Sequence, residues 1–431
     1  MSLNFPELSS IEPLVILRAF LILRLVQHAI ETWLAKSNRT WWSNRARQNE
    51  AASALGITGD DMQKTFAYSS DRYFVSRVHA MVSIIASILF IGSGGLGWTE
   101  DRAIELTSFL SGGTKVQGLI FIGLLALLSQ AMSLPFALYS TFVVEEKYGY
   151  NKQTLTGFFS DLFKATIIGI IFGAVILSLI LWIMESTGPA WWIYAWATIT
   201  IFSLFTAWIY PTLLAPLFNK FTPLEEGELK QQILELADKT GFQANGLFVM
   251  DASQRSGHGN AYFTGIFGKK RIVLFDTLVN SMTTREVTAV LAHELGHFKL
   301  HHVRKGMIRG LLISLAIFAG IGALLDYRNF YLAFGLVGVS NYGGLVVFSL
   351  WFGLLEFYLQ PFQTWFSRRH EFEADHFAKS TLGSGQDLMS ALKKLREKSS
   401  IMPIVHPLYS AMYYSHPPML ERIKMLQTDS K

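Results

Sequence analysis

The chain has 431 residues, of which 51% are hydrophobic and 14% aromatic, and its mean hydropathy is +0.31. This composition is more apolar than that of a typical soluble protein, so the sequence predicts a membrane protein. There is no cysteine, which excludes a disulfide framework and a cysteine-ligated zinc site. Any metal has to be held by histidine, aspartate or glutamate.

Seven stretches are long enough to cross the hydrocarbon core of a membrane, which takes about 20 mostly apolar residues. The first is too long, and too often interrupted by charged residues, to be a cleaved signal peptide, so we expect it to be retained as a span. The seven predicted spans are Ile11–Leu34, Tyr73–Trp98, Val116–Val144, Leu162–Met184, Trp191–Leu214, Met307–Leu325 and Tyr342–Phe366.

The orientation follows from the lysines and arginines in the short connections, because these residues are enriched on the cytoplasmic side. They are concentrated after the first and third spans, and the alternate connections contain fewer. This distribution predicts an N-terminus outside and a C-terminus in the cytoplasm. The net charge of +5 then reflects membrane topology, and we expect no nucleic-acid partner.

Two stretches lack the lipid-spanning pattern, Phe218–Lys305 and Ser367–Lys431. Both fall on the predicted cytoplasmic side, so they can form one domain although two spans separate them. The expected organisation is transmembrane helices 1–5 in residues 1–217, the first part of the cytoplasmic domain in 218–306, transmembrane helices 6–7 in 307–366, and the second part of the domain in 367–431.

The first cytoplasmic stretch has an α+β pattern. The segment "EEGELKQQILELADKTG" is an amphipathic helix that ends near Gly241, and "GLFVM", "NAYFTGI" and "KRIVLFD" have the composition of short strands. Thr283 and Glu286 then form a capping-box pattern, which predicts the start of the helix that carries His293.

The segment "VLAHELGHFKLHH" contains an HExxH pattern formed by His293, Glu294 and His297. Residues i and i+4 lie on one face of a helix, so both histidines can reach one zinc ion, and Glu294 is placed to take a proton from water. His301 continues this face but lies roughly 12 Å from His293 on a straight helix. We therefore expect His301 and His302 to be surface or supporting residues.

The third ligand is expected in "SRRHEFEADHFA", which begins where the last span leaves the membrane. Glu371 and Asp375 share a helix face, whereas Glu373 points roughly 200° away from Glu371. We assign Glu371 to the metal and Asp375 to the support of a histidine ligand. Two histidines, one carboxylate and an open position form a catalytic site, so we expect one zinc ion per chain.

Polar residues inside the spans favour a wet interior. Glu356, Gln360 and Gln363 recur at i, i+4 and i+7 on the last span, and such groups avoid lipid and face a bundle interior or a water-filled cavity. The alternative, an ordinary hydrogen bond between buried helices, fits each of them as well.

Five segments together resemble the integral-membrane CAAX prenyl protease family, type I: "VVEEKYGYNKQT", "GNAYFTGIFGKKRIVLFDTL", "HELGH", "SRRHEFEADHFAK" and "YSHPPMLERI". The resemblance implies seven helices around a large intramembrane chamber capped by the zinc domain. It also implies that His293, His297 and Glu371 are zinc ligands and that Glu294 is the general base. Two further residues, Asn260 and His416, match positions that hold the substrate or stabilise its oxyanion, and Arg422, nearby, is expected to bind the substrate.

The fold class predicted from these observations is a polytopic α-helical membrane protein, with seven transmembrane helices enclosing an intramembrane chamber and a cytoplasmic α+β zinc metalloprotease domain. The predicted function is a zinc metalloendopeptidase that cleaves near the C-terminus of CAAX-type (prenylated) or membrane-associated polypeptides. We expect the substrate to add as a strand along Asn260, Ala261, Tyr262 and Phe263, because backbone pairing supplies hydrogen bonds whatever the side chains.

Three alternatives remain open. The first is a membrane quality-control protease with unprenylated substrates. The second is a site-2 intramembrane metalloprotease, which the soluble surroundings of Glu294 disfavour. The third is a catalytically silent chamber or transport protein. We expect a monomer in contact with membrane lipid; a bacterial inner membrane is favoured, or the endoplasmic reticulum membrane if the source is eukaryotic.

Overall fold

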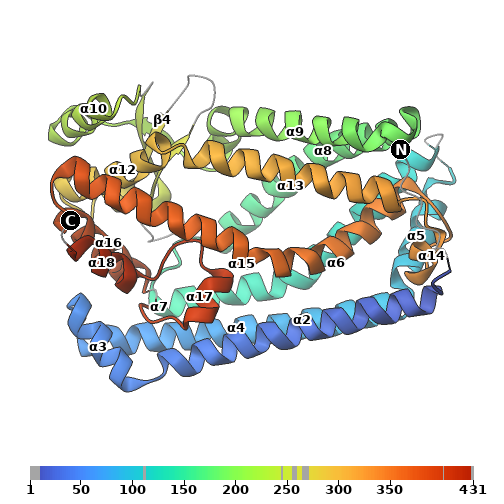
Figure 1. The fold of residues 1–431 in the computed structure, drawn as a ribbon, viewed down its shortest axis with the longest axis horizontal. Helices are drawn as coiled ribbons and strands as arrows, with labels where there is room; N and C mark the ends of the chain where they lie inside the picture. Colours follow the sequence, from blue (N-terminus) through green and yellow to red (C-terminus); the bar gives the residue numbers. More distant parts are fainter. Residues whose placement is uncertain are drawn as a thin grey trace.

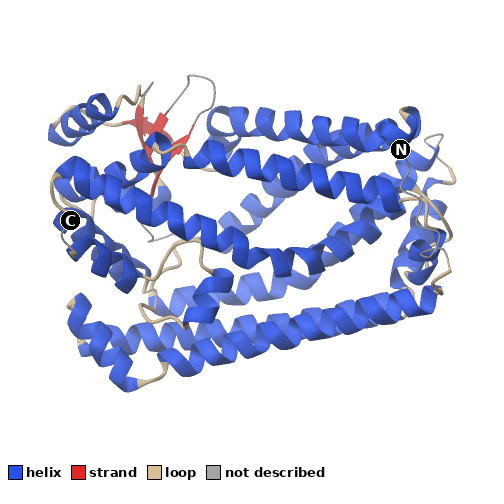
Figure 2. Ribbon diagram, in the orientation of Figure 1, coloured by secondary structure: helices blue, strands red, loops and turns tan. Residues whose placement is uncertain are grey.

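The computed structural model describes residues 10–109, 113–243, 246–254, 260–264, 271–400 and 402–428. Within these residues the chain is mainly helical, with one small sheet near one end (Figure 2). Seven of its helical segments are long and apolar enough to cross a membrane, which confirms the predicted number. The helices in these segments are α2 (Pro13–Trp42), α4 (Gly59–Gly92), α6 (Gly113–Tyr139), α8 (Leu155–Ser186), α9 (Trp191–Ile209), α13 (His302–Leu324) and α15 (Asn341–Leu382).

The second spanning helix differs most from its predicted bounds. It begins at Gly59 because the Thr58 side chain accepts a hydrogen bond from the Asp61 backbone and caps the helix well before its apolar part. It ends at Gly92, and Gly94, with φ of 80°, starts a separate helix, α5 (Gly95–Thr107), which contains the predicted end of the span.

The spanning helices lie along two opposite edges of the molecule, with others slanting between them (Figure 1). Helices α2 and α4 run along one edge and α9 and α13 along the opposite edge, while α6, α8 and α15 slant between them. In a solid bundle each helix would bury one face. In the most apolar stretch of α13, however, no residue is buried, and in the corresponding stretch of the span that contains α6 only 6% of the residues are buried. Such low burial is expected of helices that surround a chamber rather than fill a solid bundle, as the predicted fold class requires.

A four-stranded sheet with α10 (Glu228–Thr240) lies near one end of the molecule, beside the ends of α9 and α13 (Figure 1). The strand order is β1 (Phe221–Pro223), β2 (Leu247–Met250), β4 (Arg271–Phe275) and β3 (Ala261–Thr264); β2 and β4 are parallel and the other pairs antiparallel. The sequence predicted α10 and the last three strands but not the very short β1. The end of the predicted "NAYFTGI" strand lies outside the described residues.

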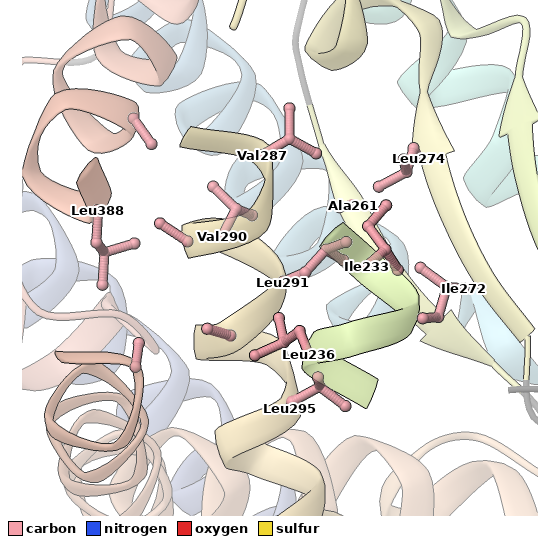
Figure 3. Packing of buried hydrophobic residues seen from close by; sticks show 14 of the residues in the cluster. Ile233, Leu236, Ala261, Ile272, Leu274, Val287, Val290, Leu291, Leu295 and Leu388 are labelled. Carbon is pink, nitrogen blue, oxygen red and sulfur yellow. The ribbon is translucent and has the colours of Figure 1, made fainter. Parts of the chain in front are cut away.

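The core of this region is built on α12 (Thr284–Lys299) (Figure 3). Val287, Leu291 and Leu295 recur every four residues and pack with side chains of α10 and β4, whereas Leu388 packs on another side of α12. Residues from before α13 and from after the last span therefore share one core. The remaining helices include α3 (Arg45–Leu55), α7 (Glu146–Tyr148), α11 (Asp276–Val279), α14 (Arg328–Ala333), α16 (Gln386–Ser399), α17 (Pro407–Tyr413) and α18 (Met419–Gln427).

The predicted capping box at the start of α12 is present, and it also ties α12 to α16. The Glu286 carboxylate accepts hydrogen bonds from the Thr283 backbone at 2.7 Å, from Ser390 Oγ at 2.6 Å and from Lys394 Nζ at 2.6 Å. Burial raises the pKa of Glu286, but the hydrogen bonds from Lys394 and Ser390 outweigh it and lower the pKa to about 2.

We expect Glu286→Gln to destabilise the protein by about 1–2 kcal/mol at pH 7, because the charged hydrogen bonds are weakened. A carboxyl whose folded pKa is depressed stabilises the fold above its unfolded pKa near 4.5, and this contribution is lost as the pH falls towards 2. The difference in thermal midpoint between wild type and variant should therefore shrink over that range. The matched control is Glu235→Gln on the exposed face of α10; a Glu286 effect that does not depend on pH would contradict the electrostatic explanation.

Candidate active site

The three side chains assigned to the metal lie together where α12 meets α15. His293 Nε2 is 3.3 Å from His297 Nε2 and 3.4 Å from Glu371 Oε2, and His297 Nε2 is 3.3 Å from Glu371 Oε1. His293 and Glu371 are buried, and His297 is partly exposed. Two imidazole nitrogens and one carboxylate thus converge on a single point.

This arrangement fits a bound metal ion. Ligand atoms at the corners of a tetrahedron, each 2.0–2.1 Å from zinc, are separated by about 3.3 Å, which matches the spacing of the three groups. The buried Glu371 Oε2 also has no hydrogen-bond partner among the described residues. A metal ion would satisfy this atom, whose burial otherwise costs free energy.

Two features of the helices bring the ligands together. A Cβ at Gly296 would lie only 3.0 Å from the Cα of Ala374, so glycine in the HExxH segment permits the close approach of α12 and α15. The last predicted span does not end at Phe366. It continues as one 42-residue helix, about 63 Å long at 1.5 Å per residue, to Leu382. Glu371 is therefore held rigidly on a membrane-spanning helix.

Asp375 and Arg422 support His293. Asp375 Oδ1 lies 2.8 Å from His293 Nδ1, which leaves Nε2 free to face the metal position. Burial lowers the pKa of His293, but its contacts with Asp375 and Glu371 outweigh burial and raise the pKa to about 9. A metal that binds Nε2 therefore has to displace a proton.

Arg422, which is expected to bind the substrate, contacts Asp375 in the structure. It donates from Nε and Nη2 to the two Asp375 oxygens at 2.8 and 2.6 Å and is only 8% exposed. A bidentate pair of this kind fixes the Asp375 carboxylate. The geometry thus favours a role in holding Asp375 and His293 over direct contact with substrate.

Glu294 lies on α12 beside the two histidines and is partly buried. Burial raises its pKa, while the positive charges of His293 and His297 act in the opposite direction. A raised pKa makes the carboxylate a stronger base towards water, as the assigned role requires.

His416 and Asn260 differ in how closely they approach this cluster. His416, between α17 and α18, places Nε2 3.4 Å from Glu371 Oε1, and its side chain is 64% exposed and so accessible to a substrate. Asn260 precedes β3 and is also exposed, with Oδ1 accepting a hydrogen bond from the Ala261 backbone at 2.8 Å. Among the described residues, no hydrogen bond or ion pair joins Asn260 to the metal ligands, although β3 packs against α12.

His302 is a supporting residue that the sequence reasoning did not resolve. Leu300 caps the end of α12, and His301 adopts a left-handed conformation with φ of 58°, so the chain turns and His302 points back into the protein. His302 Nδ1 lies 3.1 Å from His297 Nδ1, and His302 Nε2 lies 2.9 Å from Glu373 Oε2. Glu373 does point away from the metal cluster, as predicted, and there it contacts His302. The two adjacent histidines were the only signal in the sequence.

We expect His302→Ala to weaken metal affinity by about 10–100-fold, the range seen when a partner of a ligating histidine is removed. Competition with a chelator at fixed pH would measure the loss. The matched control is His301→Ala, because His301 is the neighbouring histidine and is exposed. Equal affinities of the two variants would show that the contact with His297 does not orient it.

Comparisons with known proteins agree with this geometry. A family model described as the CAAX prenyl protease N-terminal region with five membrane helices matches residues 44–220, and the model of peptidase family M48 matches residues 223–430. The CAAX prenyl protease 1 homolog of Arabidopsis thaliana is 38% identical over 379 residues, covering 87% of this chain and 89% of the relative. The chain belongs to peptidase family M48. The human CAAX prenyl protease 1 homolog is 33% identical over 440 residues, 92% of each chain.

The similarity extends to three-dimensional structure. The crystal structure of Ste24p from S. mikatae has a TM-score of 0.89 and 34% identity, covering 97% of this chain and 100% of that one. This M48 member is therefore an integral membrane metalloprotease, with a peptide as its class of substrate. The His293, His297 and Glu371 cluster could hold the metal that the family implies.

Proposed function

We propose that the protein is a zinc metalloendopeptidase that cleaves near the C-terminus of CAAX-type, prenylated or membrane-associated polypeptides. The observation that carries the proposal is the convergence of His293, His297 and Glu371 at 3.3–3.4 Å where the helices of the chamber meet the soluble domain. The named activity of the Arabidopsis and human relatives supports this choice of substrate.

The residues divide the chemistry of peptide hydrolysis among them. Zinc held by His293, His297 and Glu371 would supply Lewis-acid chemistry, polarising the scissile carbonyl and acidifying water. Glu294 accepts the proton of the attacking water and passes it to the leaving amine as the C–N bond breaks. His416, with Asn260, donates hydrogen bonds to the oxyanion of the tetrahedral intermediate.

The substrate is proposed to add as a strand to β3, along Asn260, Ala261, Tyr262 and Phe263. β3 is an edge strand: it pairs with β4 on one side, and no described strand pairs with its other side. Added-strand binding uses the free backbone groups of such an edge, and it would orient an extended peptide beside α12.

Matched peptides that differ only in a prenyl group on cysteine would test the proposal. We expect the purified protein with one zinc per chain to cut the prenylated peptide at one site near its C-terminus, with slower or no cleavage of its partner. Equal cleavage of both would favour membrane quality control with unprenylated substrates, and this outcome would also suit a bacterial inner membrane. With no cleavage of either peptide, a silent chamber or transport protein becomes the better explanation.

The proposed topology puts the N-terminus outside and residues 218–306 and 367–431 together in the cytoplasm, with the chain acting as a monomer in contact with lipid. The core shared by residues before and after the last two spans supports one domain built from both stretches. Because native cysteine is absent, single cysteines can be labelled without background.

We expect Gln243→Cys and Ser384→Cys to react with a membrane-impermeant thiol reagent only from the cytoplasmic face, and Ser108→Cys only from the opposite face. All three positions are exposed. Labelling of the Gln243 and Ser108 positions from the same side would reject the proposed topology.

A further inference from the structure

A polar cavity lies apart from the metal ligands, between α2, α4 and the segment that precedes His416. Its volume is about 280 Å³. Two arginines of α4 line it together with residues of α2 and tyrosines of the C-terminal segment. The residues that bear on its chemistry are Asn38, Arg72, Tyr73, Arg77, Tyr409 and Tyr414. We call it the arginine cavity.

The arginines of this cavity have no counter-charge. Within the part of the chain that the structure describes, no carboxylate forms an ion pair with Arg72 or Arg77, and the buried Nη1 of Arg77 has no hydrogen-bond partner. Arg72 is linked to Glu145 through Tyr68, whose hydroxyl is 3.5 Å from Arg72 Nη1 and donates to Glu145 at 2.6 Å. Arg72 is exposed and Arg77 is partly buried, so the unsatisfied Nη1 of Arg77 is the atom that an anion in the cavity would satisfy.

Arg72 and Arg77 line the same cavity as Tyr409 and Tyr414, so an anion in this cavity has both guanidinium groups in its wall. Burial raises the pKa of the Tyr409 hydroxyl, and the charges of Arg77 and Arg72 act against this rise. Two guanidinium groups beside tyrosine hydroxyls and the Asn38 amide can bind a planar anion with several hydrogen bonds.

The cavity is close to the proposed site of cleavage. Tyr414 lines the cavity, and His416, two residues further on, contacts Glu371. Two residues of extended chain span about 7 Å, and three span about 10 Å. A peptide cut a few residues from its end has the length needed to reach from His416 to this wall of the cavity.

We propose that the arginine cavity binds an anionic group, and that during the reaction this group is the α-carboxylate at the C-terminus of the substrate. The proposal rests on the proposed function, and it explains how a protease that binds backbone along an edge strand would recognise the end of a chain. Arg77, and Arg72 beside it, pair with the carboxylate and fix the distance from the terminus to the cut. A lipid phosphate has the same chemistry and is the competing occupant.

The test compares two prenylated peptides of one sequence, one ending in a free carboxylate and the other in a carboxamide. We expect the wild-type, zinc-loaded protein in neutral detergent to cleave the acid with a kcat/KM at least about 10-fold above that for the amide. Arg77→Gln should lower kcat/KM for the acid peptide by about 10–100-fold, mainly by raising KM. The same substitution should change kcat/KM for the amide peptide by less than about twofold. Arg77→Lys should restore part of the preference.

The matched control is Arg45→Gln, which removes the same charge from an exposed position on α3 outside the cavity and should leave the ratio of acid to amide unchanged. Cleavage of the amide peptide measures peptidase activity without the carboxylate contact. If wild type cleaved neither peptide, the proposed function would be refuted. Equal cleavage of the acid and amide peptides by wild type would refute only the anion site. This comparison uses wild type alone, so it does not depend on whether a variant folds. An equal loss of both substrates in Arg77→Gln, restored by vesicles containing an anionic lipid, would assign the cavity to lipid phosphate and overturn the proposal.

Discussion

Glu294→Gln is expected to lower turnover of a cleavable peptide by about 10²–10⁴-fold, the contribution typical of a general base, without loss of metal or fold. Glutamine has nearly the same shape but cannot accept a proton from water. Glu294 is also not among the three groups that converge at 3.3–3.4 Å, so the metal position should keep its ligands.

Single-turnover cleavage and elemental analysis on the same preparation would measure both properties. Glu235→Gln, an exposed substitution of the same type on α10, serves as the control and should retain wild-type turnover. Near-normal cleavage by Glu294→Gln would reject its role as the base. Loss of metal in this variant would instead make Glu294 part of the metal site.

The largest effect on metal content is expected from Glu371→Ala. Zinc should fall from about one ion per chain to less than about a tenth, because two histidines alone do not complete a protein zinc site. The substitution also removes the carboxylate that lies 3.4 Å from His293 Nε2 and 3.3 Å from His297 Nε2. Turnover should be lost together with the metal.

Elemental analysis after dialysis would measure the zinc, with His301→Ala as the matched control. His301 belongs to the same "HELGHFKLHH" run but is exposed, so its removal should leave the zinc content unchanged. If His301→Ala lost zinc while Glu371→Ala kept it, the assignment of ligands would be wrong.

The sequence by itself predicted the features that depend on neighbouring residues. The number of spans follows from hydropathy, because lipid imposes a length on any uninterrupted apolar segment. The start of α12 follows from the capping box at Thr283 and Glu286, and the shared face of His293 and His297 follows from the period of the helix. The bounds of the second span were less accurate, because the polar turns after Thr58 carry no hydropathy signal.

Only the tertiary structure decided which distant groups meet. Helical periodicity places Glu371 and Asp375 on one face, but their different partners depend on the approach of α15 to α12 at Gly296. The turn at His301 directs His302 to His297. Positions calculated for a straight α12 do not include this turn, so they did not predict the contact. The pairing of Arg422 with Asp375 and the position of Arg77 in a cavity arise from contacts across tens to hundreds of residues. Such contacts are set by packing, and a local pattern of residues contains no record of them.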